Sequence, residues 1–362
     1  MKALLHFVKD WGKFILPVVM VMIAAAWFWY QRRLRTNRYV AETLQKHSLI
    51  NDHSKIYRNK IKWPNKEAES FKNEINLLCM LFQNNRIVDF ETKKHSVVFK
   101  EAKFPRKISL NLEPTSMEVG CGEDGKAFSI LDDTLLIRVK SGGGKSVLYN
   151  AIIFSYWKSR PEGSFEIIIS DKHQSFSRLD SVEGITVFDV LTLEEKERFL
   201  EKLKAVKEYQ REVDLSFYET LSEAQAKGHA RDKKTFLILV DEFSESFSNA
   251  NSKENDYAVN KEIIATLKAI ITSARKYGQK VIIAYQSPLN SEALIHPSIF
   301  SGEVLGYVQG GVADAKGLPI HHPLLRESGT MYLSSNRYPS KFFKTAFVEK
   351  KNLLDLLKRG DR

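Results

Sequence analysis

The chain has 362 residues, enough for about two domains and for a buried core. Hydrophobic residues make up 43% and charged residues 27% of it, which excludes a wholly disordered, collagen-like or polytopic membrane protein. Its two cysteines, Cys79 and Cys121, exclude a disulfide scaffold and leave too few ligands for a zinc ribbon or an iron–sulfur cluster. Two lone cysteines are typical of a reducing compartment.

The net charge of +11 is concentrated in the first third of the chain. Residues 1–110 hold 21 Lys or Arg against 9 Asp or Glu, a surplus of +12, whereas residues 111–362 hold 34 against 35. This asymmetry indicates first a surface close to anionic lipid, and nucleic acid is the other polyanion that it would suit.

Residues 14–30 form an uncharged run of 17 residues, at the short end for a helix that crosses a hydrocarbon core of about 30 Å. Aromatic residues close the run, and an arginine cluster beginning at Arg32 follows it, as at a membrane–water interface. A cleaved signal peptide would show small residues there, and a buried core helix would not be followed by four arginines. We therefore predict a 1–13 N-terminal tail, a transmembrane helix over 14–31 and a single pass through the inner (cytoplasmic) membrane, with the body in the cytoplasm.

The rest of the chain divides by its pattern. Residues 32–106 are basic and mixed, and we predict a juxtamembrane linker and a small domain there. From residue 107 to 350, short apolar runs alternate with helical stretches, which predicts an α/β domain with a mostly parallel sheet flanked by helices. The apolar runs lie at 134–139, 165–171, 235–243, 280–286, 303–309 and 330–335. A helix is expected over 262–276, and residues 351–362 are expected to be a C-terminal tail.

A glycine-rich loop lies between the first of these runs and a helical segment, in the sequence RVKSGGGKSVLYNAIIF (138–154). Glycines let backbone N–H groups converge on phosphates, a lysine reaches the terminal phosphates, and a hydroxyl ligates Mg²⁺ beside the helix. The usual spacing places glycine at position 139, where this chain has Val139. The predicted nucleotide-binding residues are Ser141, Gly142, Gly143, Gly144, Lys145, Ser146 and Val147.

Two carboxylates end a later apolar run, LILVDE (237–242). Paired acids are tolerated there at the carboxyl end of a buried strand, where ligands bind in such sheets. Asp241 is predicted to hold Mg²⁺ together with Ser146, and Glu242 to orient and deprotonate the attacking water. Gln286, which ends the run at 280–286, is expected to sense the γ-phosphate or the water. The cofactors expected are therefore ATP and Mg²⁺.

These segments resemble the motor domain of the FtsK/SpoIIIE family, within the wider FtsK–HerA-like group. The loop resembles the family's strand, loop and helix ending in G-K-S-V, and LILVDEFSE is similar to its V-D-E-F strand. TSARKYGQKVIIAYQSP resembles the family's A-R-x-x-G helix end and T-Q-x-P strand end, with Tyr285 in place of threonine. Further likenesses lie in SDKHQSFSRL, SGTMYLSS and EVGCGEDGKAF, so that the resemblance covers about residues 107–348.

The resemblance implies a RecA-like P-loop ATPase, acting as a homo-hexameric ring around double-stranded DNA. It implies that a neighbour's arginine completes each ATP site, and Arg275 matches that motif. The chain ends soon after the sheet, without a winged-helix domain, and has one span. We therefore expect a role in DNA transfer, conjugation or mobile-element mobilisation, with transfer or secretion machinery as a partner, and not in septal chromosome segregation.

Three functions stay open at this stage. The first is an ATP-driven motor that translocates double-stranded DNA and is anchored to the membrane by residues 14–31. The second is a protein-export ATPase of a specialised secretion system. The third is a nucleotide-switched membrane scaffold with weak hydrolysis, which the presence of Val139 suggests.

Overall fold

The computed structural model describes residues 21–25, 55–57, 60–62, 87–93, 96–105, 108–247, 256–285, 295–307, 322–348 and 350–359. The chain divides into two units, Met1–Glu101 and Ala102–Arg362. In the first, four strands form an antiparallel sheet in the order β1-β2-β4-β3. They are β1 (Lys55–Tyr57), β2 (Lys60–Lys62), β3 (Ile87–Lys93) and β4 (Ser96–Glu101).

The predicted membrane span falls almost wholly outside the described residues. Residues 21–25, which belong to it, are helical. Among the described ranges, no helix combines the length and the apolar character that crossing a bilayer requires.

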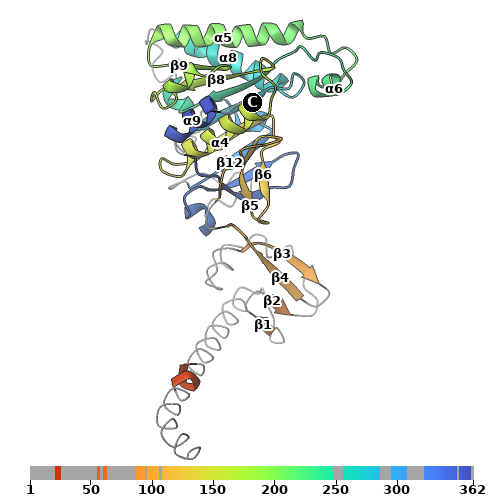
Figure 1. Ribbon diagram of the computed structural model, residues 1–362, viewed down its shortest axis with the longest axis vertical. Coiled ribbons are helices and arrows are strands. Elements are labelled where there is room, and N and C mark those ends of the chain that lie inside the picture. Colours follow the sequence, from red (N-terminus) through yellow and green to blue (C-terminus); the bar gives the residue numbers. More distant parts are fainter. Residues whose placement is uncertain are drawn as a thin grey trace, which may run out of the picture. The chain divides into compact units, whose positions relative to one another are not determined.

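The second unit is built on a ten-stranded sheet in the order β6-β5-β14-β13-β12-β7-β11-β10-β8-β9 (Figure 1). From β12 to β9 every neighbouring pair is parallel, and from β12 to β6 every pair is antiparallel. The parallel strands are β7 (Thr134–Arg138), β8 (Phe165–Asp171), β9 (Ile185–Asp189), β10 (Thr235–Val240), β11 (Lys280–Tyr285) and β12 (Gly302–Leu305). The others are β5 (Glu118–Gly122), β6 (Ala127–Ser129), β13 (Thr330–Ser335) and β14 (Lys341–Thr345).

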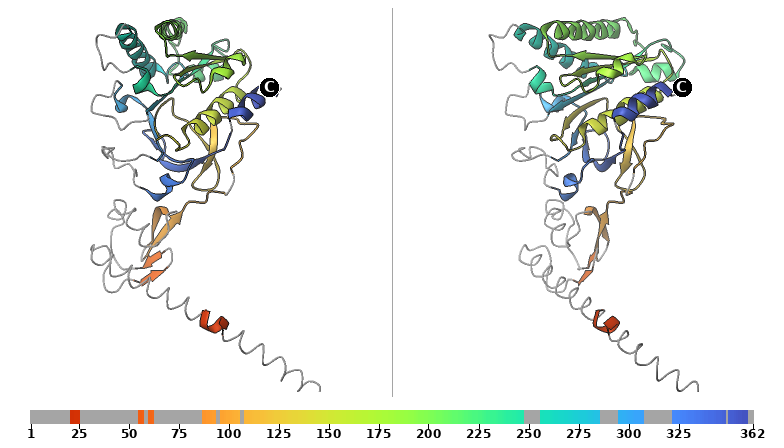
Figure 2. Two further views of the ribbon diagram at one scale, coloured as in Figure 1. Left: turned by 90° about the vertical axis from the view of Figure 1, so that its left-hand side faces the viewer. Right: turned by 60° about the vertical axis from the view of Figure 1, so that its left-hand side comes forward.

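Helices cover both faces of this sheet (Figure 2). One face carries α4 (Lys145–Lys158) and α9 (Lys350–Arg359), and the other carries α5 (Leu193–Glu212) and α8 (Tyr257–Ser273). Shorter helices are α6 (Leu221–Ala226), α7 (Phe243–Ser246), η1 (Ser177–Ser181), η2 (Pro297–Ile299) and η3 (Pro323–Arg326).

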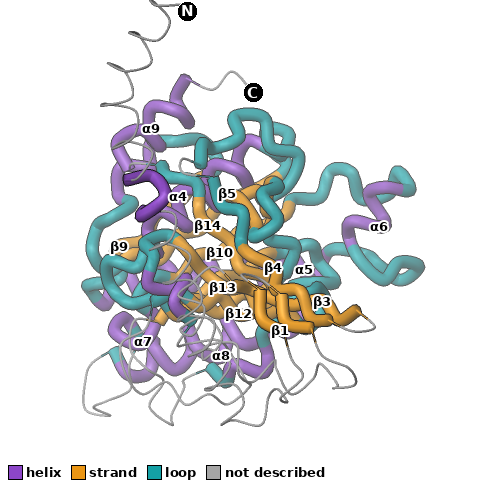
Figure 3. The backbone as a smooth tube through the Cα atoms, turned by 90° about the horizontal axis from the view of Figure 1, so that it is seen from below, coloured by secondary structure: helices purple, strands orange, loops and turns teal. Residues whose placement is uncertain are grey.

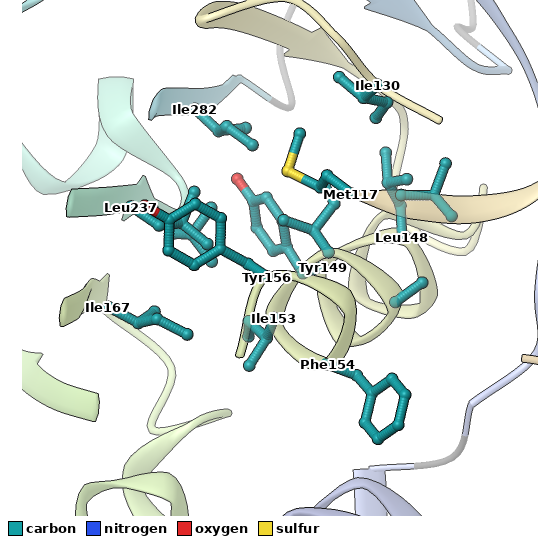
Figure 4. Packing of buried hydrophobic residues seen from close by; sticks show 14 of the residues in the cluster. Met117, Ile130, Leu148, Tyr149, Ile153, Phe154, Tyr156, Ile167, Leu237 and Ile282 are labelled. Atoms are coloured by element: carbon teal, nitrogen blue, oxygen red, sulfur yellow. The ribbon is translucent and has the colours of Figure 1, made fainter. Parts of the chain in front are cut away.

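The alternation of side chains along each central strand explains the two cores. In β10, Leu237 and Leu239 pack with α4, whereas Ile238 and Val240 pack with α5 and α8. Successive side chains of a strand point to opposite faces, so a strand buried on both sides is apolar throughout. Figure 4 shows Tyr149 and Tyr156 of α4 among Ile167, Leu237 and Ile282, which come from three different strands.

The predicted α/β class is confirmed, since every apolar run named above contains a strand and the sheet is mostly parallel. The sheet is mixed, because four antiparallel strands extend it beyond β12. The expected helix over 262–276 is α8, which begins earlier. The C-terminal segment differs from the expected tail: α9 is helical to Arg359, and Leu353 and Leu357, one turn apart, are buried in the same core as α4.

Candidate active site

The glycine-rich loop joins β7 to α4 at the edge of the sheet where the parallel strands end. The Lys140 N–H donates to the Tyr307 carbonyl at 2.9 Å, which prolongs the pairing of β7 with β12. The Gly143 N–H donates to the Lys140 carbonyl at 2.9 Å and closes a tight turn. Gly142 and Gly144 have φ values of 80° and 103°, so the loop reverses through conformations that side chains disfavour.

Several N–H groups of this loop have no acceptor among the residues that the structure describes. Within the described residues, no acceptor is found for the N–H groups of Gly142, Gly144, Lys145 and Ser146. The Leu148 N–H donates to the Gly144 carbonyl at 3.0 Å, at the start of α4. Donors at the start of a helix carry its positive dipole end and are suited to an anion. The side chain of Ser146 is exposed and that of Val147 is half-buried at this same helix start.

Val139 does not disturb the loop, although it stands where the usual spacing has glycine. Its backbone has no positive φ, and its side chain is 1% exposed in the core on the α4 face. A Cβ atom added at Gly143 would lie 2.6 Å from Val139 Cγ1, and one added at Gly306 would lie 2.8 Å from Val139 Cγ2. Gly143 and Gly306 therefore leave the room that the Val139 side chain occupies. Val139 is the last core residue before the turn.

The structure brings Lys145, Asp241 and Glu242 together. Lys145 Nζ lies 2.6 Å from Asp241 Oδ1 and is also bonded to Glu242 Oε1. The three side chains are 8%, 8% and 2% exposed, so one cation faces two carboxylates away from bulk water. Strand β11 lies between β7 and β10, and the parallel direction of all three places the loop and the acid pair at one edge.

The backbone at the acid pair is unusual. Glu242 is in the left-handed region, with φ 49° and ψ 46°, a conformation that costs a residue with a side chain about 1–2 kcal/mol. The Asp241 N–H donates to the Ser170 carbonyl at 3.0 Å and continues the pairing of β10 with β8. Strain of this kind is concentrated at functional sites, where the surrounding contacts hold it.

Two groups that the sequence interpretation assigned no role lie close to these acids. Burial raises the pKa of the Tyr149 hydroxyl well above its usual value, and the charges of Asp241, Glu242 and Asp171 raise it further. That hydroxyl contacts the Val240 carbonyl at 3.4 Å, so it stays protonated beside the acid pair. The fully buried Asp171 carboxylate accepts from the N–H groups of His173 and Phe176, which fixes the segment after β8.

A hollow of about 700 Å³, the loop hollow, adjoins the glycine-rich loop. Gly144 and Val147 form one wall, and Leu110, Leu112 and Phe347 contribute apolar side chains from both ends of the domain. Phe347 is 67% exposed and Leu112 is 54% exposed. Sequence reasoning missed these residues because nothing local marks them: they lie tens or hundreds of positions from the loop and meet only through the fold.

The other predicted site residues fall elsewhere. Gln286 lies outside the described residues, directly after the end of β11. Arg275 is exposed and follows α8, near the start of β7 at the opposite edge of the sheet from Lys145. Within one chain, Arg275 and the loop are thus at opposite ends of the strands.

The oxygen atoms at the acid pair are ligands of the type that Mg²⁺ binds. Within the described residues no group of three or more His, Cys, Asp or Glu side chains could enclose a metal. Mg²⁺ commonly uses one or two protein oxygens together with phosphate oxygens and water, and Ser146 and Asp241 would supply such a pair. The residues present therefore suit a magnesium–nucleotide complex better than a metal cage.

Comparison with known proteins adds the fold. No protein-family model matches the sequence, and no curated protein matches it significantly. Among solved structures, the monomer of the pCW3 conjugation coupling protein TcpA, determined with ATPγS, has a TM-score of 0.56 at 15% identity, over 90% of this chain and 99% of that one. This chain therefore shares the α/β fold of that coupling protein, with a mixed and mostly parallel sheet.

Two secretion ATPases are similar over part of their length. The cytoplasmic domain of the type VII secretion ATPase EccC of Thermomonospora curvata has a TM-score of 0.53 at 18% identity, over 67% of this chain and 30% of that one. EssC (ATPases 2 and 3) from Geobacillus thermodenitrificans has a TM-score of 0.53 at 12% identity, over 71% and 51%. This chain thus spans about a third to a half of those two chains, and at such identities the likeness is one of fold.

Proposed function

We propose that this protein is a magnesium-dependent ATPase whose active site is the edge of the sheet at Lys145, Asp241 and Glu242. The observation that carries the proposal is the contact of Lys145 with both acids, combined with the unpaired N–H groups of the adjoining loop. One cation, two carboxylates and a helix start in this arrangement suit a triphosphate with its metal. The loop hollow, apolar and next to Gly144, is placed to receive the base and ribose.

Each residue then has a distinct task. Lys145 exchanges its carboxylate partners for phosphate oxygens, and the N–H groups of the loop donate to the same phosphates. Asp241 and Ser146 would hold Mg²⁺, which would supply positive charge to neutralise the phosphates. Glu242, released from Lys145, accepts a proton from the attacking water.

We further propose that hydrolysis drives a polymer through a ring of these chains, with double-stranded DNA as the polymer. The sequence resemblance to FtsK-type motors and the fold similarity to a conjugation coupling protein support this proposal. Arg275 is exposed at the opposite edge from the loop, and in the proposed ring it would act on the nucleotide of a neighbouring copy. Residues 14–31 would anchor the ring to the membrane.

The first experiment is phosphate release by the protein and by Glu242→Gln. A motor requires that the variant binds nucleotide and hydrolyses it at least about 100-fold more slowly. Glu245→Gln is the matched control, because Glu245 is exposed on α7 and pairs with Lys172 away from Lys145. Equally slow release by all three proteins would contradict hydrolysis and favour the nucleotide-switched scaffold.

The second experiment separates DNA from protein as the cargo, because secretion ATPases share the fold. Binding of duplex DNA is measured at two salt concentrations, and the rate of hydrolysis is measured with and without DNA. A DNA motor loses affinity steeply with salt, since phosphate contacts release counterions, and DNA stimulates its hydrolysis. Salt-independent or absent DNA binding would contradict the DNA motor and favour protein export.

A further inference from the structure

A second hollow, of about 510 Å³, lies at the opposite edge of the sheet from the loop, and we name it the edge hollow. Thr235 and Lys280, the first residues of β10 and β11, form its floor. The end of α4 contributes Arg160, and a projecting segment over residues 213–234, the arm, contributes Arg231. The arm contains α6 and projects from the side of the larger unit (Figure 1 and Figure 3).

The arm is fixed against the body, so the edge hollow has a defined shape. Val213, Leu215, Leu221 and Ala224 form a small buried cluster of their own, packed against Tyr277 and Tyr209. The Leu221 N–H donates to the Lys276 carbonyl at 2.8 Å. The arm is therefore held against the body of the domain by packing and by a hydrogen bond.

The lining of the edge hollow carries more positive than negative charge. Arg160, Arg231 and Lys280 line it, and the acidic residue among its lining residues in the described part of the chain is Asp133. Asp133 is already paired with Arg337 at 2.5 Å and lies 3.7 Å from Lys280. Neither Arg160 nor Arg231 has a carboxylate partner among the residues that the structure describes. Two guanidinium charges are left without an acidic partner there.

The Arg160 guanidinium is held in place before any ligand arrives. It lies over the ring of Tyr156, 3.5 Å from the centroid, and its Nη1 donates to the Tyr156 carbonyl and to Ser159 Oγ. The Tyr156 hydroxyl is in turn bonded to Thr235 Oγ1 at 3.1 Å. A guanidinium has five N–H donors, and these bonds use one nitrogen, so most of its donors are left for a ligand.

Lys280 also lines the edge hollow and lies close to Asp133 and to the charge of Arg160. Its Nζ donates to the carbonyls of Leu131 and Asp132, at 3.3 and 2.9 Å. Burial lowers the pKa of Lys280, Asp133 opposes this, and the positive charge of Arg160 lowers the pKa further. An anion bound between Lys280 and Arg160 would remove this repulsion.

We propose that the edge hollow binds a small phosphorylated molecule of nucleotide size, with its phosphate between Arg160 and Arg231. Guanidinium groups form paired, charge-assisted hydrogen bonds with phosphate oxygens, and the hydroxyls of Ser159 and Ser222 supply further donors. Leu131, which is 50% exposed, lines another part of the hollow and provides apolar surface for a ring. The volume lies in the range of small-molecule sites. This site is separate from the proposed ATP site and does not depend on it.

The test is calorimetric titration of the full chain with two probes, inorganic pyrophosphate and AMP. In the double variant Arg160→Gln, Arg231→Gln, one of the binding events in the titration should weaken at least about tenfold, because two charge-assisted contacts are removed. Arg211→Gln is the matched control, since Arg211 is exposed on α5 and pairs with Glu208. Tighter binding of AMP than of pyrophosphate would show that the apolar part of the hollow contributes.

Lys145→Ala separates the two sites. The component that the arginine pair controls should persist in Lys145→Ala, whatever the outcome of the ATPase experiments. Equal affinities in the double variant and in Arg211→Gln overturn the proposal, as does binding that disappears with Lys145 alone. Thermal melts report folding, and Arg231→Gln by itself, at an exposed position of the arm, repeats the test if the double variant does not fold.

Discussion

The two edges of the large sheet differ in how their charged side chains are paired. At the carboxyl edge, Asp241 and Glu242 both contact Lys145, so each buried acid has a cationic partner. At the opposite edge, the buried Asp132 is bonded to Ser335 Oγ at 2.9 Å, and burial raises its pKa. Two guanidinium groups of the same edge, those of Arg160 and Arg231, lack acidic partners in the described part of the chain. At the first edge Lys145 is occupied by two acids and must exchange them for a ligand, whereas the second edge can bind an anion directly.

Removal of the shared cation should have the largest effect on stability. Lys145→Ala leaves two carboxylates buried side by side, and we expect a loss of about 3–5 kcal/mol in the free energy of unfolding. Urea denaturation measures it. Lys227→Ala, in the exposed pair with Glu223, should cost about 0.3–0.5 kcal/mol. If both losses were similar, the acids at the carboxyl edge would not depend on Lys145.

Restoring the usual glycine at position 139, in the turn at the carboxyl edge, should destabilise the protein. Val139→Gly removes a side chain that is 1% exposed, and we expect a loss of about 2–4 kcal/mol from the cavity and the added backbone freedom. Thermal or urea unfolding of the purified variant checks this value. An unchanged or improved stability would show that position 139 belongs to the loop and not to the core.

Gly143→Ala tests the same contact from the other side. The new Cβ meets Val139 Cγ1 at 2.6 Å, so the single substitution should cost about 1–3 kcal/mol. In the Val139→Gly background the cost should fall, because the clashing atom is gone, and the double-mutant cycle measures this coupling. Ser141→Ala, at an exposed position of the same turn, is the control. Simple additivity would contradict the contact.

A substitution at the opposite edge should have a smaller effect of opposite sign. Since the folded-state pKa of Asp132 is raised, the native state binds the extra proton, and stability falls as the pH rises from the ordinary carboxyl value through the raised one. Asp132→Asn, which stays neutral, should therefore stabilise the protein by less than about 1 kcal/mol at pH 7. The advantage should shrink toward pH 4. Denaturation at the two pH values checks this, and a destabilised variant at pH 7 would contradict it.

Much of the fold could be predicted from the sequence because buried strands and helices carry local patterns. The apolar runs at 165–171 and 235–243 contain β8 and β10, and the leucine and isoleucine spacing of 262–276 predicts α8. Short or charged elements such as β9, β14 and α9 were not predicted, because their local patterns are weak and their burial depends on neighbours in the fold. The packing of Leu353 against the core of α4 has no local signal.

For the candidate site, the sequence by itself determined which residues could act, since glycines, a lysine and paired acids after an apolar run are chemically specific. Only the tertiary structure decided that Lys145 contacts Asp241 and Glu242, that Val139 is a core residue and that Arg275 lies at the other edge. The loop hollow and the edge hollow also came from the structure alone. The physical reason is that chemical identity is local, whereas distance and burial depend on which strands the parallel sheet places side by side.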